Sequence, residues 1–142
     1  MERTPYLASL IGKRWDAQGK GPDTYSCWSL AREIEKVLWD RDLPDVDFPV
    51  NPTLRWMLET IASHPEQAKW VDHGSCHGPI SANDGAIVLM GRVDRPAHIG
   101  VWLKPEGGII HADQMCGVCF ESPAILKVKG WGRLHFYEPI RE

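Results

Sequence analysis

The chain has 142 residues and a mass of 16.0 kDa, and we expect one domain over residues 1–142. A hydrophobic fraction of 43% and a charged fraction of 25% are typical of globular proteins and exclude intrinsic disorder. The net charge of −3 supplies no basic face, so nucleic acid is excluded as a partner. The longest apolar run, Ala86–Met90, is too short for a signal peptide or a membrane span. We therefore expect no membrane partner and synthesis in the cytoplasm.

The first half of the chain has the patterns of helices. Residues 5–12 form a short predicted helix that Gly12 ends. Apolar residues at helical spacing predict a second helix from Ser26, a good N-cap, to about Trp39. The same spacing predicts a third helix over residues 53–63.

The second half has the patterns of strands. Short apolar or alternating runs between turn residues predict strands at 86–90, 98–103, 109–112, 124–128 and 133–137. Helices precede strands along the chain, which indicates an α+β fold with N-terminal helices packed on an antiparallel β-sheet.

Cys27 lies in the first turn of the best-defined predicted helix. Unpaired amides and the helix dipole stabilise an anion there, so the position predicts a lowered thiol pKa. The alternative is structural, because cysteine is a common buried residue.

Two histidines and an aspartate share one face of the predicted sheet. Residues 104–107 form a predicted four-residue hairpin loop, so residue 103 pairs with residue 108. If the register is shifted by two residues, His98 lies opposite His111 instead. Because side chains alternate along a strand, both registers put His98, His111 and Asp113 on the same face. Opposite or diagonal neighbours lie about 4.5–8 Å apart, so one imidazole can orient the other.

A cysteine, a histidine and a third polar group are what thiol acyl transfer requires. The thiolate attacks a carbonyl, the first imidazole moves the proton, and the third group fixes its tautomer. The backbone amide at the helix start stabilises the oxyanion. The pattern therefore predicts an enzyme that forms a thioester.

Segments in four places resemble the NlpC family of papain-like cell-wall cysteine peptidases, most closely its phage tail-associated members. They occur in the family's order: 24–32 around Cys27, 83–90, 97–101 with its His-Ile-Gly-Val, and 109–112. The resemblance implies a papain-like fold, Cys27 as nucleophile, His98 as base and acid, and His111 as the orienting residue. It implies hydrolysis of peptidoglycan stem peptides at a γ-D-glutamyl to diamino-acid bond, without a cofactor. It further implies phage tail proteins as partners and a place in the virion.

The substrate-binding positions depart from that family. An Asp before the nucleophile and an upstream Tyr help the family hold the free amino end of the stem peptide. In this chain Ser26 is at the position of that Asp, and Trp15 is at the position of that Tyr. We assign these two positions to substrate binding, together with Trp28, Trp102 and Asp113 beside the proposed site. The two tryptophans next to site residues either pack in the core or line a cleft for sugar or peptide.

Two other interpretations remain open. Cys116-x-x-Cys119, with His73, Cys76 and His77, would make a zinc-stabilised structural domain. Against it, a strand through this region would point Cys116 and Cys119 to opposite faces, so we predict no metal. The second alternative is a catalytically idle assembly or binding module of a phage tail with the same fold.

Overall fold

The computed structural model describes residues 2–16, 18–43, 70–75, 82–92, 95–131 and 133–139. Its helices are α1 (Arg3–Leu10), α2 (Cys27–Trp39) and α4 (Pro123–Val128). Its strands are β1 (Arg14–Trp15), β2 (Thr24–Tyr25), β3 (Trp70–Ser75), β4 (Ile87–Arg92), β5 (Arg95–Leu103), β6 (Gly108–Asp113), β7 (Gly117–Glu121) and β8 (Arg133–Pro139). The helix predicted at 53–63 lies outside the described residues.

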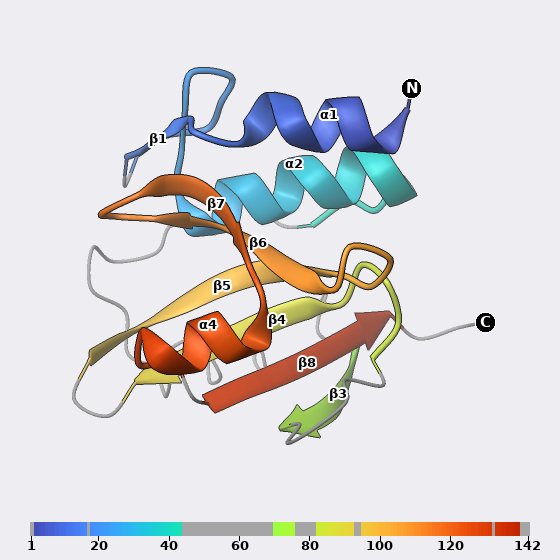
Figure 1. Ribbon diagram of the computed structural model, residues 1–142. Coiled ribbons are helices and arrows are strands. Elements are labelled where there is room, and N and C mark those ends of the chain that lie inside the picture. The colour runs from blue at the N-terminus through green and yellow to red at the C-terminus, as the bar shows by residue number, and fades with distance from the viewer. Residues whose placement is uncertain are drawn as a thin grey trace.

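The main sheet is antiparallel in every described pairing and follows the order β3-β8-β4-β5-β6-β7 (Figure 1). The short strands β1 and β2 form a separate parallel pair. Helices precede most of the sheet in the chain, as predicted, and the α+β fold class is confirmed.

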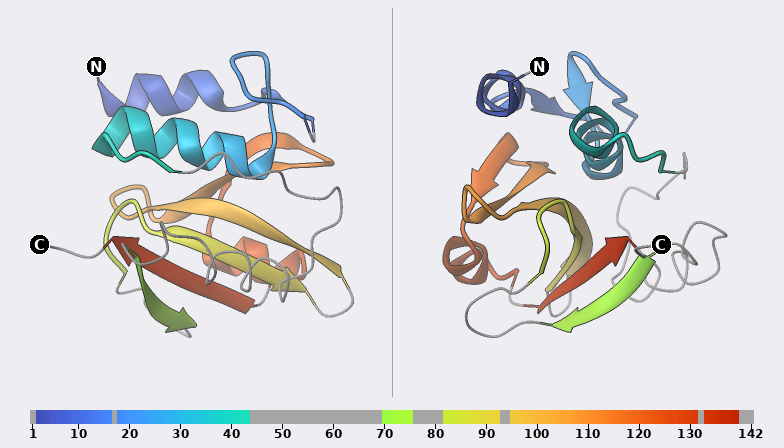
Figure 2. Two further views of the ribbon diagram at one scale, coloured as in Figure 1. Left: turned by 180° about the vertical axis from the view of Figure 1, so that it is seen from behind. Right: turned by 90° about the vertical axis from the view of Figure 1, so that its right-hand side faces the viewer.

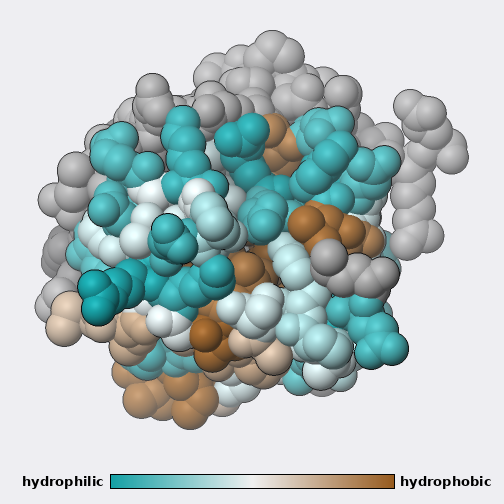
Figure 3. Space-filling view, turned by 90° about the horizontal axis from the view of Figure 1, so that it is seen from above, coloured by the Kyte–Doolittle hydropathy of each residue, from teal (hydrophilic) through white to brown (hydrophobic). Residues whose placement is uncertain are grey.

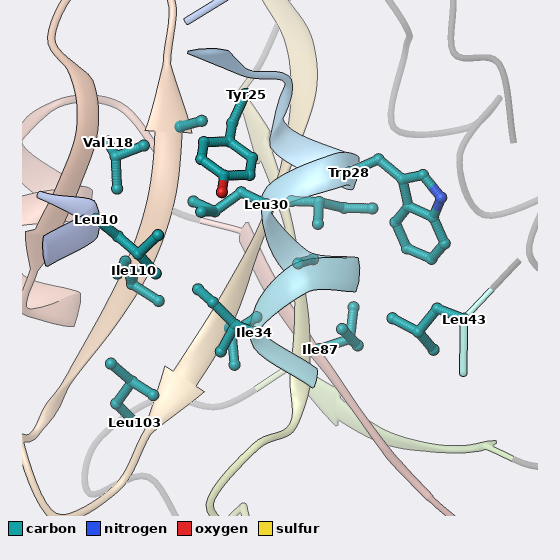
Figure 4. Close-up of a cluster of buried hydrophobic side chains, with 14 of the residues drawn as sticks. Leu10, Tyr25, Trp28, Leu30, Ile34, Leu43, Ile87, Leu103, Ile110 and Val118 are labelled. Carbon is teal, nitrogen blue, oxygen red and sulfur yellow. The ribbon is translucent and has the colours of Figure 1, made fainter. Parts of the chain in front are cut away.

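The sheet is strongly curved and separates two hydrophobic cores (Figure 2). The first core joins α1 and α2 to one face of the sheet, and Figure 4 shows its side chains converging there. Its sheet residues include Ile99, Val101 and Ile110, as the alternation predicts. The second core lies on the other face, where Trp102, Ile109, Leu126 of α4 and Phe136 pack together. The strands of the proposed site therefore carry buried side chains on both faces.

Helix α2 begins where its sequence predicts. Ser26 is the N-cap: its hydroxyl accepts the backbone N–H of Ser29 at 3.2 Å, and the Ser29 hydroxyl accepts the backbone N–H of Ser26 at 2.9 Å. This capping box satisfies the N–H of Ser29 in the first turn, while the N–H of Ser26 also donates to the Gly19 carbonyl at 3.2 Å. The apolar face of α2 buries Leu30 and Ile34 in the first core. The capping box and this buried face hold Cys27 at the start of the helix.

The hairpin between β5 and β6 has the first of the two predicted registers. Leu103 pairs with Gly108, and Gly100 pairs with His111. The four-residue loop 104–107 is confirmed, since these residues form the turn. His98 is therefore diagonal to His111, with Gly100 between them on the same face.

The prediction for residues 124–128 is wrong, because this segment is helix α4. The Ser122 hydroxyl accepts the N–H of Ile125 at 3.3 Å, and Pro123 occupies the first turn, where its missing N–H costs nothing. An N-cap serine followed by proline is a helix-start signal that outweighs the apolar run. Strands β1, β2 and β3 were not predicted.

The loop after α1 is hydrogen-bonded to the outer edge of β7. Gly12 N–H donates to the Val118 carbonyl at 2.8 Å, and Val118 N–H donates to the Lys13 carbonyl at 2.8 Å. Gly117 has φ +74°, and a side chain at this position would collide with the Lys13 carbonyl. The N-terminal segment is thereby joined to the strand that carries Glu121.

Seen from the side of α1 and α2, the surface is mainly hydrophilic with scattered hydrophobic patches (Figure 3). Exposed apolar side chains in the described chain include Ile11, Val37 and Met115. Among the described helices, none has the length and apolar character needed to cross a bilayer.

Candidate active site

Cys27 is the first residue of α2, and its thiol lies against strand β5. The backbone amides of Ile99, Trp28 and Cys27 itself form hydrogen bonds that favour the thiolate. Ile99 directly follows His98 in β5, so the Cys27 thiol is bonded to this strand at the residue next to the proposed base. The amides at the helix start could also stabilise the oxyanion that forms on a substrate carbonyl when the sulfur attacks its carbon.

The pKa of Cys27 differs from its predicted direction. Burial raises it to about 11, and the amides of Ile99 and the helix start offset only part of this effect. The helix N-terminus acts as expected, but desolvation of the thiolate is the larger effect. The resting thiol is therefore protonated at neutral pH and needs a base.

His98 and His111 are in direct contact. Nε2 of His98 lies 2.8 Å from Nδ1 of His111, and the rings meet edge to face with centroids 4.9 Å apart. His98 also stacks on Trp131 at 5.3 Å. His111 is 0% exposed and His98 is 8% exposed, so both rings are held by their surroundings. Because Gly100 has no side chain, the two rings can meet across its position.

Glu121 of β7 extends this pair, and no local sequence pattern predicted it. Its Oε1 lies 2.9 Å from Nε2 of His111, and Lys129 pairs with the same carboxylate, its Nζ 2.8 Å from Oε2. Burial would raise the Glu121 pKa, but bonds from Lys129 and Cys119 and the nearby His111 hold it below its usual value. The alternating apolar residues Val118 and Phe120 are typical of a strand. Pairing that strand with β6 would have placed Glu121 beside His111.

The ionised Glu121 determines the tautomer of both imidazoles. Burial lowers the pKa of His111, so this ring is neutral at neutral pH. A carboxylate only accepts hydrogen bonds, so Nε2 of His111 must carry its proton and Nδ1 must be the acceptor. Nε2 of His98 then donates to that Nδ1 at 2.8 Å. In neutral His98 this leaves Nδ1 as the basic nitrogen, the form needed to accept the thiol proton.

Cys119 lies beside the same pair of residues. It is directly opposite His111 across β6 and β7. Its Sγ is 3.5 Å from Nε2 of His111 and 3.3 Å from Oε1 of Glu121. Burial, with a further contribution from Glu121, raises the Cys119 pKa to about 12. His111, Cys119 and Glu121 together form a group whose ligand atoms lie within 4.8 Å of one another and could hold a metal ion.

Of the described residues that the zinc hypothesis names, Cys119 alone belongs to this group. Cys116 is exposed in the turn before β7, whereas Cys119 is half-buried inside the strand. His73 is described only by its backbone, and Cys76 and His77 lie outside the described residues.

The proposed substrate-binding residues have structural contacts. Asp113 is on the His111 face, but its Oδ1 accepts the N–H of Met115 at 2.7 Å in the turn. Ser26 caps α2, and half-buried Trp15 packs against the first core.

Neither tryptophan beside the site is on an open surface. Trp28 is 8% exposed and belongs to the first core (Figure 4). Trp102 is 5% exposed and belongs to the second core, where its Nε1 donates to the Ala82 carbonyl at 3.1 Å. The structure therefore supports the packing alternative for both residues.

Comparison with solved structures identifies the fold. The chain is similar to the crystal structure of the NlpC/p60 domain of peptidoglycan hydrolase SagA, with a TM-score of 0.54 and 18% sequence identity. The match covers 93% of this chain and 92% of that domain. No protein-family model matches the chain, and no curated protein matches it. The likeness confirms the expected papain-like NlpC-type fold; at this identity it is evidence of fold alone.

Proposed function

We propose that the chain is a cysteine peptidase that hydrolyses peptide bonds in peptidoglycan, with Cys27 as nucleophile and His98 as base and acid. The observation that carries this proposal is the chain of contacts from His98 through His111 to Glu121, together with a cysteine at a helix N-terminus that is bonded to the backbone of Ile99, the residue after His98. The NlpC/p60 fold supports it, because the similar domain belongs to a peptidoglycan hydrolase.

The reaction begins with the protonated thiol. Nδ1 of His98 takes the Cys27 proton as the sulfur forms a bond to the substrate carbonyl carbon. The carbonyl electrons move to oxygen, and the amides at the start of α2 stabilise that oxyanion. His98 returns the proton to the leaving nitrogen while the carbon–nitrogen bond breaks, which leaves a thioester on Cys27. His98 then deprotonates a water that attacks the thioester, and the acid product leaves with Cys27 again a thiol.

The pair His111–Glu121 supports each proton transfer. When His98 becomes an imidazolium, its Nε2–H still donates to Nδ1 of His111. The negative charge of Glu121 lies on the far side of the His111 ring. This arrangement stabilises the imidazolium without itself taking the proton, as the orienting group of a triad does.

The bond that is cut is a finer part of the proposal. We infer a γ-D-glutamyl to diamino-acid bond in stem peptides and a partnership with phage tail proteins, on the sequence resemblance alone. Recognition of the amino end must differ from the family's usual mode, because Ser26 stands for the expected Asp and its hydroxyl caps α2.

The decisive test uses Cys27→Ala on a panel of muropeptides and γ-glutamyl amides. We expect the wild-type chain to release stem-peptide fragments and the variant to release none, with unchanged circular dichroism. Cys116→Ser is the matched control, since Cys116 is an exposed thiol in the turn before β7. It should retain full activity. Equal activity of wild type and Cys27→Ala would refute the mechanism.

The same panel tests the alternative of a catalytically idle module of this fold. Burial of the Cys27 thiol, which raises its pKa to about 11, favours that alternative. Failure of the wild-type chain to cleave any member of the panel would support the idle module.

A further inference from the structure

Three potential metal ligands project together from strands β6 and β7. The Nε2 of His111, Sγ of Cys119 and Oε1 of Glu121 form a triangle with sides of 2.9, 3.5 and 3.3 Å. Ligands around a tetrahedral zinc ion, at its usual bond lengths to N, O and S, stand about 3.4–3.6 Å apart. The 3.5 Å side already matches that spacing, the 3.3 Å side is slightly shorter, and the 2.9 Å side needs to open by about half an ångström. Imidazole, thiolate and carboxylate are the ligands that zinc prefers.

We propose that His111, Cys119 and Glu121 form a binding site for a zinc-class divalent cation, and that its occupancy inhibits the hydrolase. The binding site stands on the geometry of these three residues, while the inhibition rests on the proposed function. The site uses His111 but none of the atoms that form bonds to the substrate.

The cation replaces protons that now bridge the three groups. Oε1 of Glu121 currently receives the N–H of His111, the S–H of Cys119 and a bond from Nζ of Lys129 at 2.9 Å. On binding, the Cys119 proton leaves to solvent, and the Nε2 proton of His111 moves to its Nδ1, so the imidazole stays neutral. The +2 charge of the ion is balanced by the thiolate and the carboxylate. Nζ of Lys129 gives up its 2.9 Å bond to Oε1 and keeps its 2.8 Å contact with Oε2, so the carboxylate binds the ion through Oε1 alone.

Binding reverses the hydrogen bond on which His98 depends. With a proton on its Nδ1, His111 becomes the donor, and Nε2 of His98 must accept. The proton of neutral His98 then resides on Nδ1, the nitrogen that has to take the thiol proton from Cys27. The base is thus in its inactive tautomer, although no substrate contact has changed. A wrong histidine tautomer is a severe defect in triad enzymes.

Metal binding is measured first, in the Cys27→Ala protein, so that the nucleophile cannot contribute a ligand. Co²⁺ is added as a probe, because a sulfur-to-cobalt charge-transfer band reports thiolate ligation directly. We expect this band with Cys27→Ala and with Cys27→Ala/Cys116→Ser, and its loss with Cys27→Ala/Cys119→Ser. Zn²⁺ affinity should fall by more than about 100-fold in the Cys119 variant, because even loss of an outer-shell partner costs up to that factor.

Inhibition is measured next, on muropeptide hydrolysis with otherwise wild-type Cys27. Zn²⁺ should inhibit the wild type and Cys116→Ser, and a chelator should restore both. Because Cys119 bonds to Glu121, the activity of Cys119→Ser is compared with its own value without metal, and Zn²⁺ should not lower it. Cys119→Ala is the second variant if the serine variant fails to fold, as judged by circular dichroism.

The outcomes separate the two proposals. Absence of the cobalt band, or the same band in the Cys116 and Cys119 variants, overturns the metal site. Metal binding that leaves hydrolysis unchanged overturns the inhibition. An inactive wild type would refute the proposed function, while the cobalt result would still decide the binding site.

Discussion

Oε1 of Glu121 lies 2.9 Å from Nε2 of His111, and this contact determines the protonation pattern of the site. Through His111 it specifies which nitrogen of His98 is basic, although Glu121 and Cys27 are 94 positions apart (121 − 27) in the sequence. Glu121 is a positioning residue: it acts on the reaction only through another side chain.

Glu121→Gln should lower kcat by about 10- to 100-fold with little change in KM, the usual cost of losing an outer-shell partner. The amide has no charge with which to stabilise the imidazolium and can present a donor to His111. Kinetics on a muropeptide would show this effect. Glu106→Gln makes the same change in the β5–β6 turn, where Glu106 pairs with Arg3, and should leave kcat unaltered. A fall in thermal stability with unchanged kcat would assign Glu121 a purely structural role.

Alkylation should reveal that the Cys27 thiol is protonated at rest. Because burial raises its pKa to about 11, iodoacetamide should modify Cys27 slowly at pH 6 and progressively faster up to pH 10. Peptide mass spectrometry would follow the rate, with exposed Cys116 as the internal reference. Rapid modification of Cys27 at pH 6 would instead indicate a thiolate–imidazolium pair in the free enzyme.

Gly100→Ala should damage both stability and activity. The added methyl group would lie 2.6 Å from Cγ2 of Ile109 and 2.9 Å from the Ile110 carbonyl oxygen. Such overpacking costs about 1–3 kcal/mol of unfolding free energy, and it would move β6 and His111 away from His98. Denaturant unfolding and kcat measure the two effects.

Ile110→Val is the control for Gly100→Ala, since its side chain faces the first core on the opposite side of the sheet. It should lose about 0.5–1.5 kcal/mol of stability and keep its kcat. If Gly100→Ala loses stability but retains full kcat, the close approach of His98 and His111 does not depend on this glycine.

Glu35 should make the protein less stable as the pH rises. It is buried in α2, and Arg41 binds its Oε2 at 3.0 Å. Burial, partly offset by Arg41, raises its pKa from 4.5 to about 8. The unfolded chain therefore releases this proton first, and the unfolding free energy falls between about pH 5 and 8, by at most about 1.4 kcal/mol per unit.

Denaturant unfolding at several pH values would measure this dependence. Glu35→Gln does not titrate and should flatten the profile in that window, whereas exposed Glu2→Gln should keep the wild-type slope. Equal slopes in all three proteins would show that Glu35 is ionised in the folded state throughout.

Local patterns predicted the elements that carry Cys27, His98 and His111. The N-cap serine predicted the start of α2, and the four-residue loop predicted two possible registers for β5 and β6, of which the structure has the first. These signals are local, because each depends on a few neighbouring residues.

The missed features depend on longer-range pairing. Glu121 joins the site only because β7 pairs with β6, and the burial that protonates Cys27 arises from packing of α2 on β5. An isolated glutamate after Phe120 has no sequence signal for that role. Residues 124–128 were misassigned because their apolar run suits a strand or a helix, and the preceding Ser122-Pro123 cap decides between them.

The bonds of Gly12 and Lys13 to Val118 have a consequence for association. A bare edge strand is a template on which a second chain can add its own strand and begin to aggregate. Here the segment after α1 already occupies backbone donors and acceptors along β7. Intermolecular strand addition at β7 would have to displace this segment and would disturb the strand that holds Glu121. The N-terminal segment thus shields this edge from unwanted self-association while it supports the site.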